Sequence, residues 1–348
     1  MDRKQDFNMN DFSELTPYVQ NKNITDIRWD GQSLWIDDLE KGKTKLPDVK
    51  LSDEFLNIFM ARLSDFANVN FNKSNPKVEA ETQNLRITAV HPSVTATGLT
   101  FTIRKTEPER RLNEQKMLDS HYCNQKILDM LEAFVKGRFS IIVTGDVGSG
   151  KTELIKFMTK FIPNELTTIT VEDNFEIRCR AINPDMDCVE IKVNDNFTYT
   201  DAIKASLRQN TKWLLMAEAR SREVLNLLEA ASTGCSVMTT IHSSDVRNIP
   251  DRIVQMLGAD GEEKRNDVFT FFDVGIMISK DSDETGISRN ISQICLFERS
   301  FENNDKNEVI MLYDNGEFTG NQIPEHLQRK IKKGHGIVPE IPRGGVNA

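Results

Sequence analysis

The sequence lacks the features of a membrane-spanning, secreted or disulfide-stabilised protein. None of its apolar runs approaches the roughly 18–20 residues needed to cross a bilayer. The first twelve residues, MDRKQDFNMNDF, lack the apolar core of a secretion signal. Its five cysteines are widely spaced and form no C-x-x-C pair, so neither a disulfide framework nor a zinc knuckle is indicated. We therefore expect a cytoplasmic protein whose cysteines are reduced.

Positive charge is also scarce. The 348 residues include 44 Lys and Arg against 53 Asp and Glu, which gives a net charge of −9. Residues 1–105 are close to neutral, whereas residues 141–348 hold 32 acidic and 24 basic side chains. Because a protein that follows a phosphate backbone needs a basic groove, we expect no stable binding to nucleic acid.

The length predicts two or three domains, and a polar segment marks a boundary between two of them. The segment TEPERRLNEQ, residues 106–115, separates stretches of different texture. We expect an N-terminal α+β domain over 1–105, a linker over 106–120 and a second domain over 121–348. In the first domain, the patterns predict a hairpin with a tight turn at Asp30-Gly31, a helix and two further strands. Their ranges are 24–38, 51–69, 84–90 and 99–105.

After the linker, strands alternate with helices. The strands lack a regular alternation of polar and apolar residues, as expected for a parallel sheet covered on both faces. The sequence therefore predicts a doubly wound α/β domain. Its strands are expected at 139–145, 167–173, 213–218 and 236–242, and its helices near 151–161, 200–209 and 221–232. Later helices are expected at 246–257 and 262–272, weaker strands at 274–279, 291–298 and 308–313, and no regular structure over 333–348.

A phosphate-binding motif follows the first of these strands. The sequence GDVGSGKT fits G-x-x-x-x-G-K-[ST] and lies between an apolar strand and a helix-forming run. Glycines let successive backbone N–H groups point at one centre, and the helix N-terminus adds positive charge. We expect Lys151 to reach the β- and γ-phosphates of ATP and Thr152 to coordinate Mg²⁺. The predicted nucleotide site is Gly145, Asp146, Val147, Gly148, Ser149, Gly150, Lys151 and Thr152.

Other polar residues end neighbouring strands of the predicted sheet. Glu172 and Asp173 end one strand, and Glu218 ends another, where a carboxylate can hold Mg²⁺ or orient a water molecule. His242 ends the fourth strand, and we expect it to couple hydrolysis to movement. An arginine is also needed to stabilise charge on the γ-phosphate. The residues alone leave four candidates: Arg86, Arg104, Arg208 and Arg220.

Four motifs, in order, resemble those of the secretion ATPases that serve type II secretion, type IV secretion, conjugation, and type IV or Tad pilus assembly. GDVGSGKT is similar to the family's Walker A motif, and ITVEDNFEI (169–177) to its Asp box. LLMAEARSREVLNLLEAASTG (214–234) is similar to its Walker B region, and MTTIHSSD (238–245) to its His box. The N-terminal stretch 85–105 also fits, and the resemblance covers roughly residues 15–300.

The resemblance implies roles for particular residues. Glu172 would activate water, Glu218 would lie near Mg²⁺, and His242 would be the coupling histidine. Arg104 and Arg220 would be the catalytic arginines. It also implies a RecA-like P-loop NTPase domain, a homo-hexameric ring, and peripheral docking on membrane-embedded secretion or pilus components.

The chain departs from the family's usual motifs at three places. Lys212 stands where an aspartate is usual, Ala217 where a glycine is usual, and Cys235 where a histidine is usual. The extra methyl group of Ala217 and the reversed charge of Lys212, both beside the site, are expected to slow turnover or alter subunit contacts. The leading interpretation is a motor that hydrolyses Mg-ATP. The alternatives are an ATPase stimulated by DNA, and a nucleotide-gated scaffold with little hydrolysis.

Overall fold

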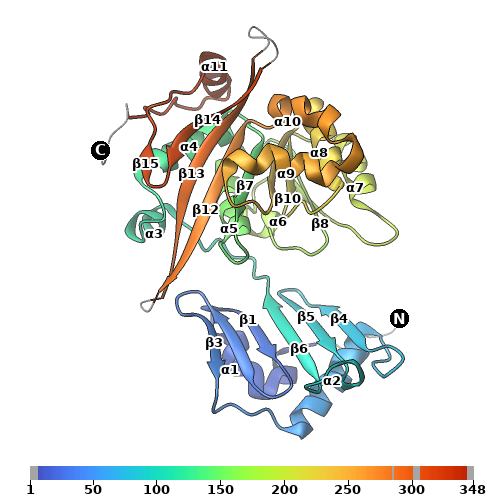
Figure 1. Ribbon diagram of the computed structural model, residues 1–348. Helices are drawn as coiled ribbons and strands as arrows, with labels where there is room; N and C mark the ends of the chain where they lie inside the picture. Colours follow the sequence, from blue (N-terminus) through green and yellow to red (C-terminus); the bar gives the residue numbers. More distant parts are fainter. Residues whose placement is uncertain (1–6, 284–285, 301–305, 343–348) are drawn as a thin grey trace. The chain divides into compact units, whose positions relative to one another are not determined.

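The computed structural model describes residues 7–283, 286–300 and 306–342 (Figure 1). The chain divides into two compact units. The N-terminal unit comprises Met1–Glu107 with Ser282–Ile287, and the C-terminal unit comprises Pro108–Asp281 with Ser288–Ala348. Part of the segment expected as a linker is helical, because α3 spans Glu114–Asp119 and buries Met117.

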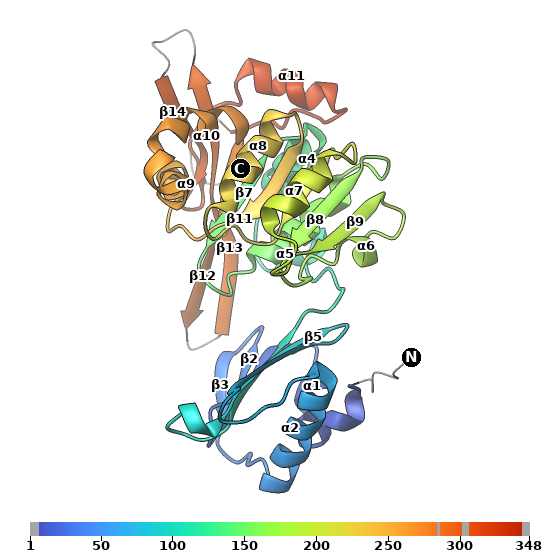
Figure 2. The same ribbon diagram turned by 90° about the vertical axis from the view of Figure 1, so that its right-hand side faces the viewer.

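The N-terminal unit is a six-stranded sheet with helices on one face (Figure 2). Neighbouring strands are antiparallel in the order β3-β2-β1-β6-β5-β4. The apolar side of α2 packs on this sheet and supplies Phe55, Phe59 and Leu63 to the core. The elements are η1 (Met9–Leu15), α1 (Thr16–Gln20), β1 (Ile24–Trp29), β2 (Leu34–Asp38), β3 (Gly42–Leu46), α2 (Asp53–Ala67), β4 (Lys77–Glu81), β5 (Leu85–Val90), η2 (Pro92–Val94) and β6 (Thr100–Lys105).

The predicted hairpin forms, with a tight turn between Asp30 and Ser33. Strands β1 and β2 pair antiparallel and are joined by four residues, 30–33. The Asp30 carboxylate accepts hydrogen bonds from the backbone N–H groups of Gln32 and Ser33, at 2.9 and 2.8 Å, and from Trp35 Nε1 at 2.7 Å. The backbone N–H of Asp30 also donates to the carbonyl oxygen of Ser33 at 3.2 Å, so Gly31, with a φ of 99°, and Gln32 form a tight turn, as predicted around Asp30-Gly31.

The C-terminal unit contains a nine-stranded sheet in the order β15-β14-β13-β12-β7-β11-β10-β8-β9. The six strands from β12 to β9 are parallel, and β13, β14 and β15 extend the sheet on one side. The strands are β7 (Ile141–Gly145), β8 (Thr168–Glu172), β9 (Cys188–Lys192), β10 (Trp213–Met216), β11 (Ser236–Thr240), β12 (Val274–Asp283), β13 (Gly286–Ser300), β14 (Lys306–Asp314) and β15 (Glu317–Phe318).

Helices cover both faces of this sheet, so its strands are apolar throughout. Ile141 and Val143 of β7 join the core beneath α4 and α5, whereas Ile142 joins the core beneath α7, α8 and α9. This doubly wound arrangement is the one predicted. The helices are α4 (Gln125–Lys136), α5 (Lys151–Met158), η3 (Thr159–Phe161), α6 (Cys179–Ile182), α7 (Tyr199–Leu207), α8 (Glu223–Ser232), η4 (Val246–Asn248), α9 (Ile249–Leu257), η5 (Gly258–Asp260), η6 (Glu262–Lys264), α10 (Arg265–Phe271) and α11 (Glu325–Lys333).

Several elements were not predicted. Helix α4 and strand β9 flank predicted elements, and α11 follows the last predicted strand. Of residues 333–348, which were expected to lack regular structure, Lys333 ends α11, 334–342 form neither a helix nor a strand, and 343–348 lie outside the described residues. Within the described ranges, no helix has both the length and the apolar character needed to span a bilayer.

Candidate nucleotide-binding site

The P-loop connects β7 to α5 at the carboxyl end of a central parallel strand. Its three glycines adopt positive φ angles of 144° at Gly145, 73° at Gly148 and 94° at Gly150. A Cβ atom on Gly145 would also lie 2.4 Å from the carbonyl oxygen of Ile278 in β12. Other residues would be strained at these positions, so the loop requires its glycines.

Lys151 begins α5 and turns back into the loop. Its Nζ donates to the carbonyl oxygens of Gly145 and Asp146, at 2.9 and 3.0 Å. Burial lowers the pKa of Lys151, while the charges of Glu218 and Asp146 act in the opposite direction. The hydroxyl of Ser149 is buried and has no hydrogen-bond partner within the described part of the chain. A phosphate group would offer acceptors to both side chains, so the residues fit a nucleotide.

Glu218, His242 and Arg220 form a connected polar cluster beside Lys151. His242 Nε2 lies 3.2 Å from Glu218 Oε1, and Arg220 Nη2 lies 3.0 Å from Glu218 Oε2. Lys151 Nζ lies 3.4 Å from His242 Nδ1. Since the ammonium group of Lys151 can only donate, Nδ1 accepts and Nε2 carries the proton that is donated to Glu218. Residues from three separate strand ends thus meet at the P-loop.

Asp173 joins the same cluster from β8. Its Oδ2 lies 3.6 Å from Arg220 Nη1, and its backbone N–H donates to the Tyr199 hydroxyl at 3.1 Å. Side-chain hydrogen bonding to Glu218 raises the pKa of Arg220. Arg220 therefore stays charged between two carboxylates that come from neighbouring strands.

Glu172 is placed differently from its neighbour Asp173. Its side chain is fully buried, and Oε2 accepts hydrogen bonds from the backbone N–H groups of Glu176 and Ile177, at 2.9 and 3.0 Å. Its Oε1 is buried without a hydrogen-bond partner among the described residues. Here Glu172 anchors the loop that follows β8. Its role in activating water stays a prediction.

The burial of Glu172 predicts a pH-dependent stability. Burial raises its pKa from 4.5 to about 7, although the two backbone hydrogen bonds oppose this. The folded protein therefore binds the proton more tightly than the unfolded chain, and the free energy of unfolding falls as pH rises through this window. The free energy of unfolding is measured in urea at pH 5 and at pH 8. We expect its decrease between the two pH values to be roughly 2–3 kcal/mol smaller for Glu172→Gln than for the wild type. Equal losses for both proteins would contradict this assignment.

The other three arginine candidates belong to β5, β6 and the end of α7. In the N-terminal unit, Arg104 Nε donates to Asp26 Oδ1 at 2.8 Å, and Arg86 lies opposite Arg104 in the β5–β6 register. Arg208 caps the end of α7, where its backbone N–H bonds to Ala205. A catalytic role for Arg104 stays a prediction, as does coordination of Mg²⁺ by Thr152 and Glu218.

The three departures from the family's motifs lie in or next to the parallel sheet. The carbonyl oxygen of Ala217 accepts a 2.7 Å hydrogen bond from Thr240 Oγ1. Cys235 is buried just before β11, and burial raises its pKa to about 11. Lys212 is half-buried, and its Nζ donates to the Asn210 side chain at 2.8 Å. Ala217 is thus the departure nearest to Glu218.

Two basic residues at the P-loop were missed by the sequence analysis. Arg289 of β13 donates from Nε to the carbonyl oxygen of Gly148 at 3.2 Å, and a Cβ built on Gly148 would lie 3.4 Å from Lys280 Nζ of β12. Both belong to strands that the sequence indicated only weakly. No local motif marks them, because their position depends on which strand lies beside β7.

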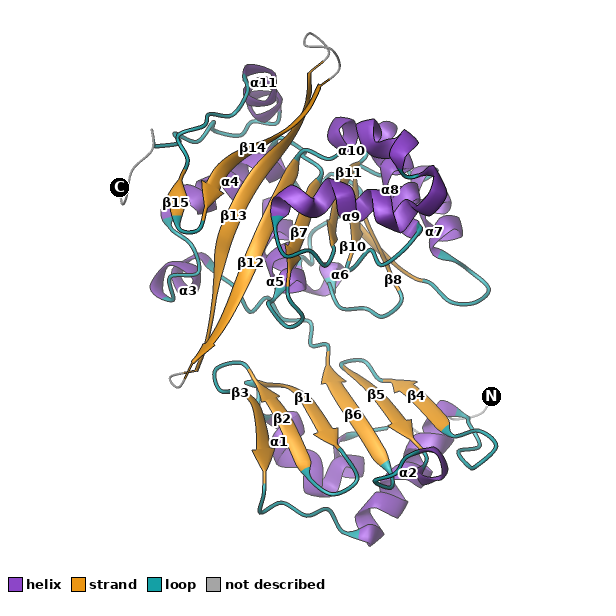
Figure 3. Cartoon of the chain, in the orientation of Figure 1, coloured by secondary structure: helices purple, strands orange, loops and turns teal. Residues whose placement is uncertain are grey.

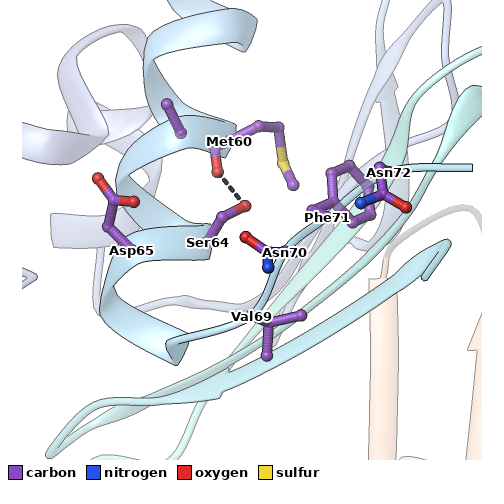
Figure 4. A pocket seen from close by; sticks show the side chains of 8 residues that line it. Met60, Ser64, Asp65, Val69, Asn70, Phe71 and Asn72 are labelled. Atoms are coloured by element: carbon purple, nitrogen blue, oxygen red, sulfur yellow. Dashed lines mark hydrogen bonds between the residues drawn. The ribbon is translucent and has the colours of Figure 1, made fainter. Parts of the chain in front are cut away.

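Two hollows lie elsewhere on the molecule. One, of about 330 Å³, borders the end of α2 and residues 69–72; there Ser64 Oγ donates to the carbonyl oxygen of Met60 (Figure 4). The other, of about 420 Å³, lies at the amino ends of β7, β11 and β12, where Lys330 forms an ion pair with Asp273. Neither includes a residue of the P-loop.

The strand order, the two helical layers and the P-loop define the C-terminal unit as a RecA-like P-loop NTPase fold, as predicted. The type II/IV secretion system protein family matches residues 53–276. The chain belongs to this family, which confirms the resemblance seen in the sequence.

Individual relatives are more distant. An uncharacterized protein of Bacillus anthracis is 28% identical over 272 residues, which cover 76% of this chain and 61% of that protein. The chain spans about half to three-fifths of the length of the curated relatives that it matches first. Among solved structures, the Legionella pneumophila ATPase DotB has a TM-score of 0.64 at 18% identity, covering 85% of this chain and 83% of DotB. The pilus retraction motor PilT with bound ADP has a TM-score of 0.55 at 18% identity, covering 92% of this chain and 85% of PilT. Both likenesses concern the fold.

Proposed function

We propose that the protein is a motor ATPase that hydrolyses Mg-ATP to drive a secretion, conjugation or pilus-assembly machine. The observation that carries this proposal is the chain of contacts from Lys151 through His242 to Glu218. It joins a phosphate-binding lysine to a carboxylate that can bind Mg²⁺ or orient water. Family membership supports the same conclusion.

The site's residues divide the chemistry between them. The backbone N–H groups of the P-loop, together with Lys151 and Ser149, would hold the phosphates, and Thr152 with Glu218 would hold Mg²⁺. Bound Mg-ATP supplies the phosphoryl group that is transferred to water. Arg220 keeps Glu218 oriented and adds positive charge beside it. Glu218 then has the position and the charge to direct a water molecule.

Lys151 and His242 would connect nucleotide binding to movement. Lys151 donates to two loop carbonyl groups and to His242, and it must give up some of these bonds to reach a phosphate. His242 would then lose its donor and alter its contact with Glu218 on β10. The contacts at the ends of β10 and β11 would therefore differ between the nucleotide-bound and nucleotide-free protein.

The mechanical part of the proposal concerns assembly and partners. We propose that six copies form a ring and that the ring docks peripherally, from the cytoplasm, on membrane-embedded components. The type II/IV secretion system family supports this, as does a fold shared with a pilus retraction motor. The acidic charge of the chain supports partners other than nucleic acid.

Light scattering tests the assembly. The mass is measured with and without Mg²⁺ and a non-hydrolysable ATP analogue, and then with DNA added. We expect the nucleotide to favour a species near six chains, with no effect of DNA. A chain that stays monomeric with the analogue, and hydrolyses ATP only with DNA, would contradict the proposed motor.

A further inference from the structure

Two basic side chains, Lys280 and Arg289, lie at the P-loop on the side opposite the Glu218–His242 cluster. In the sheet order, β7 lies between β11 and β12, and β13 follows β12 (Figure 3). Glu218 and His242 come from the strand ends of β10 and β11, whereas Lys280 and Arg289 come from β12 and β13. The loop is therefore flanked by a carboxylate–imidazole cluster on one side and by two basic residues on the other.

Arg289 is the more closely placed of the two. Its Nε donates to the carbonyl oxygen of Gly148 at 3.2 Å, and a Cβ on Gly150 would lie 3.9 Å from its Cδ. The side chain thus lies along the glycine-rich face of the loop.

The charge of Arg289 lies in a partly buried setting. Burial lowers its pKa, although the nearby Tyr122 acts in the opposite direction. The lowered pKa means that burial disfavours the charged form. A phosphate oxygen next to the guanidinium would offset that penalty through charge-assisted hydrogen bonds.

The two flanks of the loop are suited to different parts of a nucleotide. The γ-phosphate must face the groups that hold Mg²⁺ and orient water, which lie on the β10–β11 flank. The α-phosphate and the nucleoside then extend toward the β12–β13 flank. Resting on the proposed function, we propose that Arg289, assisted by Lys280, binds the α-phosphate side of the nucleotide and sets affinity for ADP and ATP alike.

The proposal is tested by titrating ADP and ATP, each with Mg²⁺, into the full chain and following heat. Arg289→Gln should weaken the binding of both nucleotides by the same factor, about 10- to 100-fold, since a hydrogen bond to a charged group is lost. Arg299→Gln is the matched control. Arg299 lies on the same strand, and its Nη1 donates to Thr270 Oγ1. The Arg299→Gln protein should bind both nucleotides with affinities within about twofold of the wild type.

Arg289→Lys separates phosphate binding from support of the loop. The lysine keeps the positive charge but loses the Nε bond to Gly148. If Arg289 binds phosphate, Arg289→Lys should recover part of the affinity that Arg289→Gln loses. Added salt should then reduce the difference in affinity between the lysine and glutamine variants. If the side chain only supports the loop, the lysine variant will bind no better than the glutamine variant, which overturns the proposal.

Other outcomes are equally decisive. Wild-type affinity in Arg289→Gln, or a loss confined to ATP, overturns the proposal while leaving the proposed function intact. A wild-type chain that binds neither nucleotide overturns the proposed function, and this inference with it. Should Arg289→Gln fail to fold, Arg289→Ala takes its place in the same comparison with Arg289→Lys.

Discussion

Replacing Lys151 with alanine should abolish nucleotide turnover, lowering kcat/KM by at least about 10³-fold. Lys151 is buried at the start of α5, and its Nζ lies among the loop carbonyl groups and within 3.4 Å of His242. Lys280 and Arg289 lie by Gly148, whereas Lys151 Nζ lies between the Gly145 carbonyl oxygen and His242, so we expect neither to take its place. Phosphate release from ATP, measured with excess Mg²⁺, gives the result.

Lys160→Ala is the matched control for this experiment. Lys160 follows α5 in η3 and pairs with Glu114, so its loss removes the same charge without touching the loop. Turnover of the control should stay within about twofold of wild type. If a folded Lys151→Ala protein hydrolysed ATP normally, the loop between β7 and α5 would not be the catalytic site.

Replacing Glu218 with glutamine should separate binding from hydrolysis. Turnover should fall by roughly 10²–10³-fold, because the carboxylate that orients water or holds Mg²⁺ is lost. Affinity for ATP should stay close to wild type, since the P-loop is unchanged. Binding is measured by titration and turnover by phosphate release from the same preparation.

Glu229→Gln provides the control, because Glu229 is an exposed residue of α8 in the same segment of the chain. It should leave both binding and turnover unchanged. Undiminished hydrolysis by Glu218→Gln would show that Glu218 is not the catalytic carboxylate. Asp173 would then be the next residue to test. Asp173 is the other acidic side chain paired with Arg220.

The sequence predicts much of this site because its motifs lie at strand ends. The carboxyl ends of parallel strands meet at one edge of the sheet, so Glu218 and His242 could be placed near Lys151 from their positions alone. What the pattern could not show is orientation. Glu172 and Asp173 are adjacent in sequence, yet Glu172 is buried in its own loop while Asp173 faces Arg220.

Other features depend on pairings between distant segments. Lys280 and Arg289 reach the P-loop because β12 lies beside β7. The two strands are far apart in sequence, since Val274 of β12 pairs with Ile141 of β7, 133 residues earlier. Helix α3 lies inside the segment that was predicted to be a linker, because Met117 is buried in the hydrophobic core. Local composition carries no information on either pairing.

The most direct test of the account is phosphate release from ATP by the purified full chain, with Mg²⁺ and then with EDTA. We predict slow but measurable release with Mg²⁺, lost on chelation and lost in Glu218→Gln. Tight binding of ATP without any release beyond the Glu218→Gln level would contradict a motor and identify a nucleotide-gated scaffold.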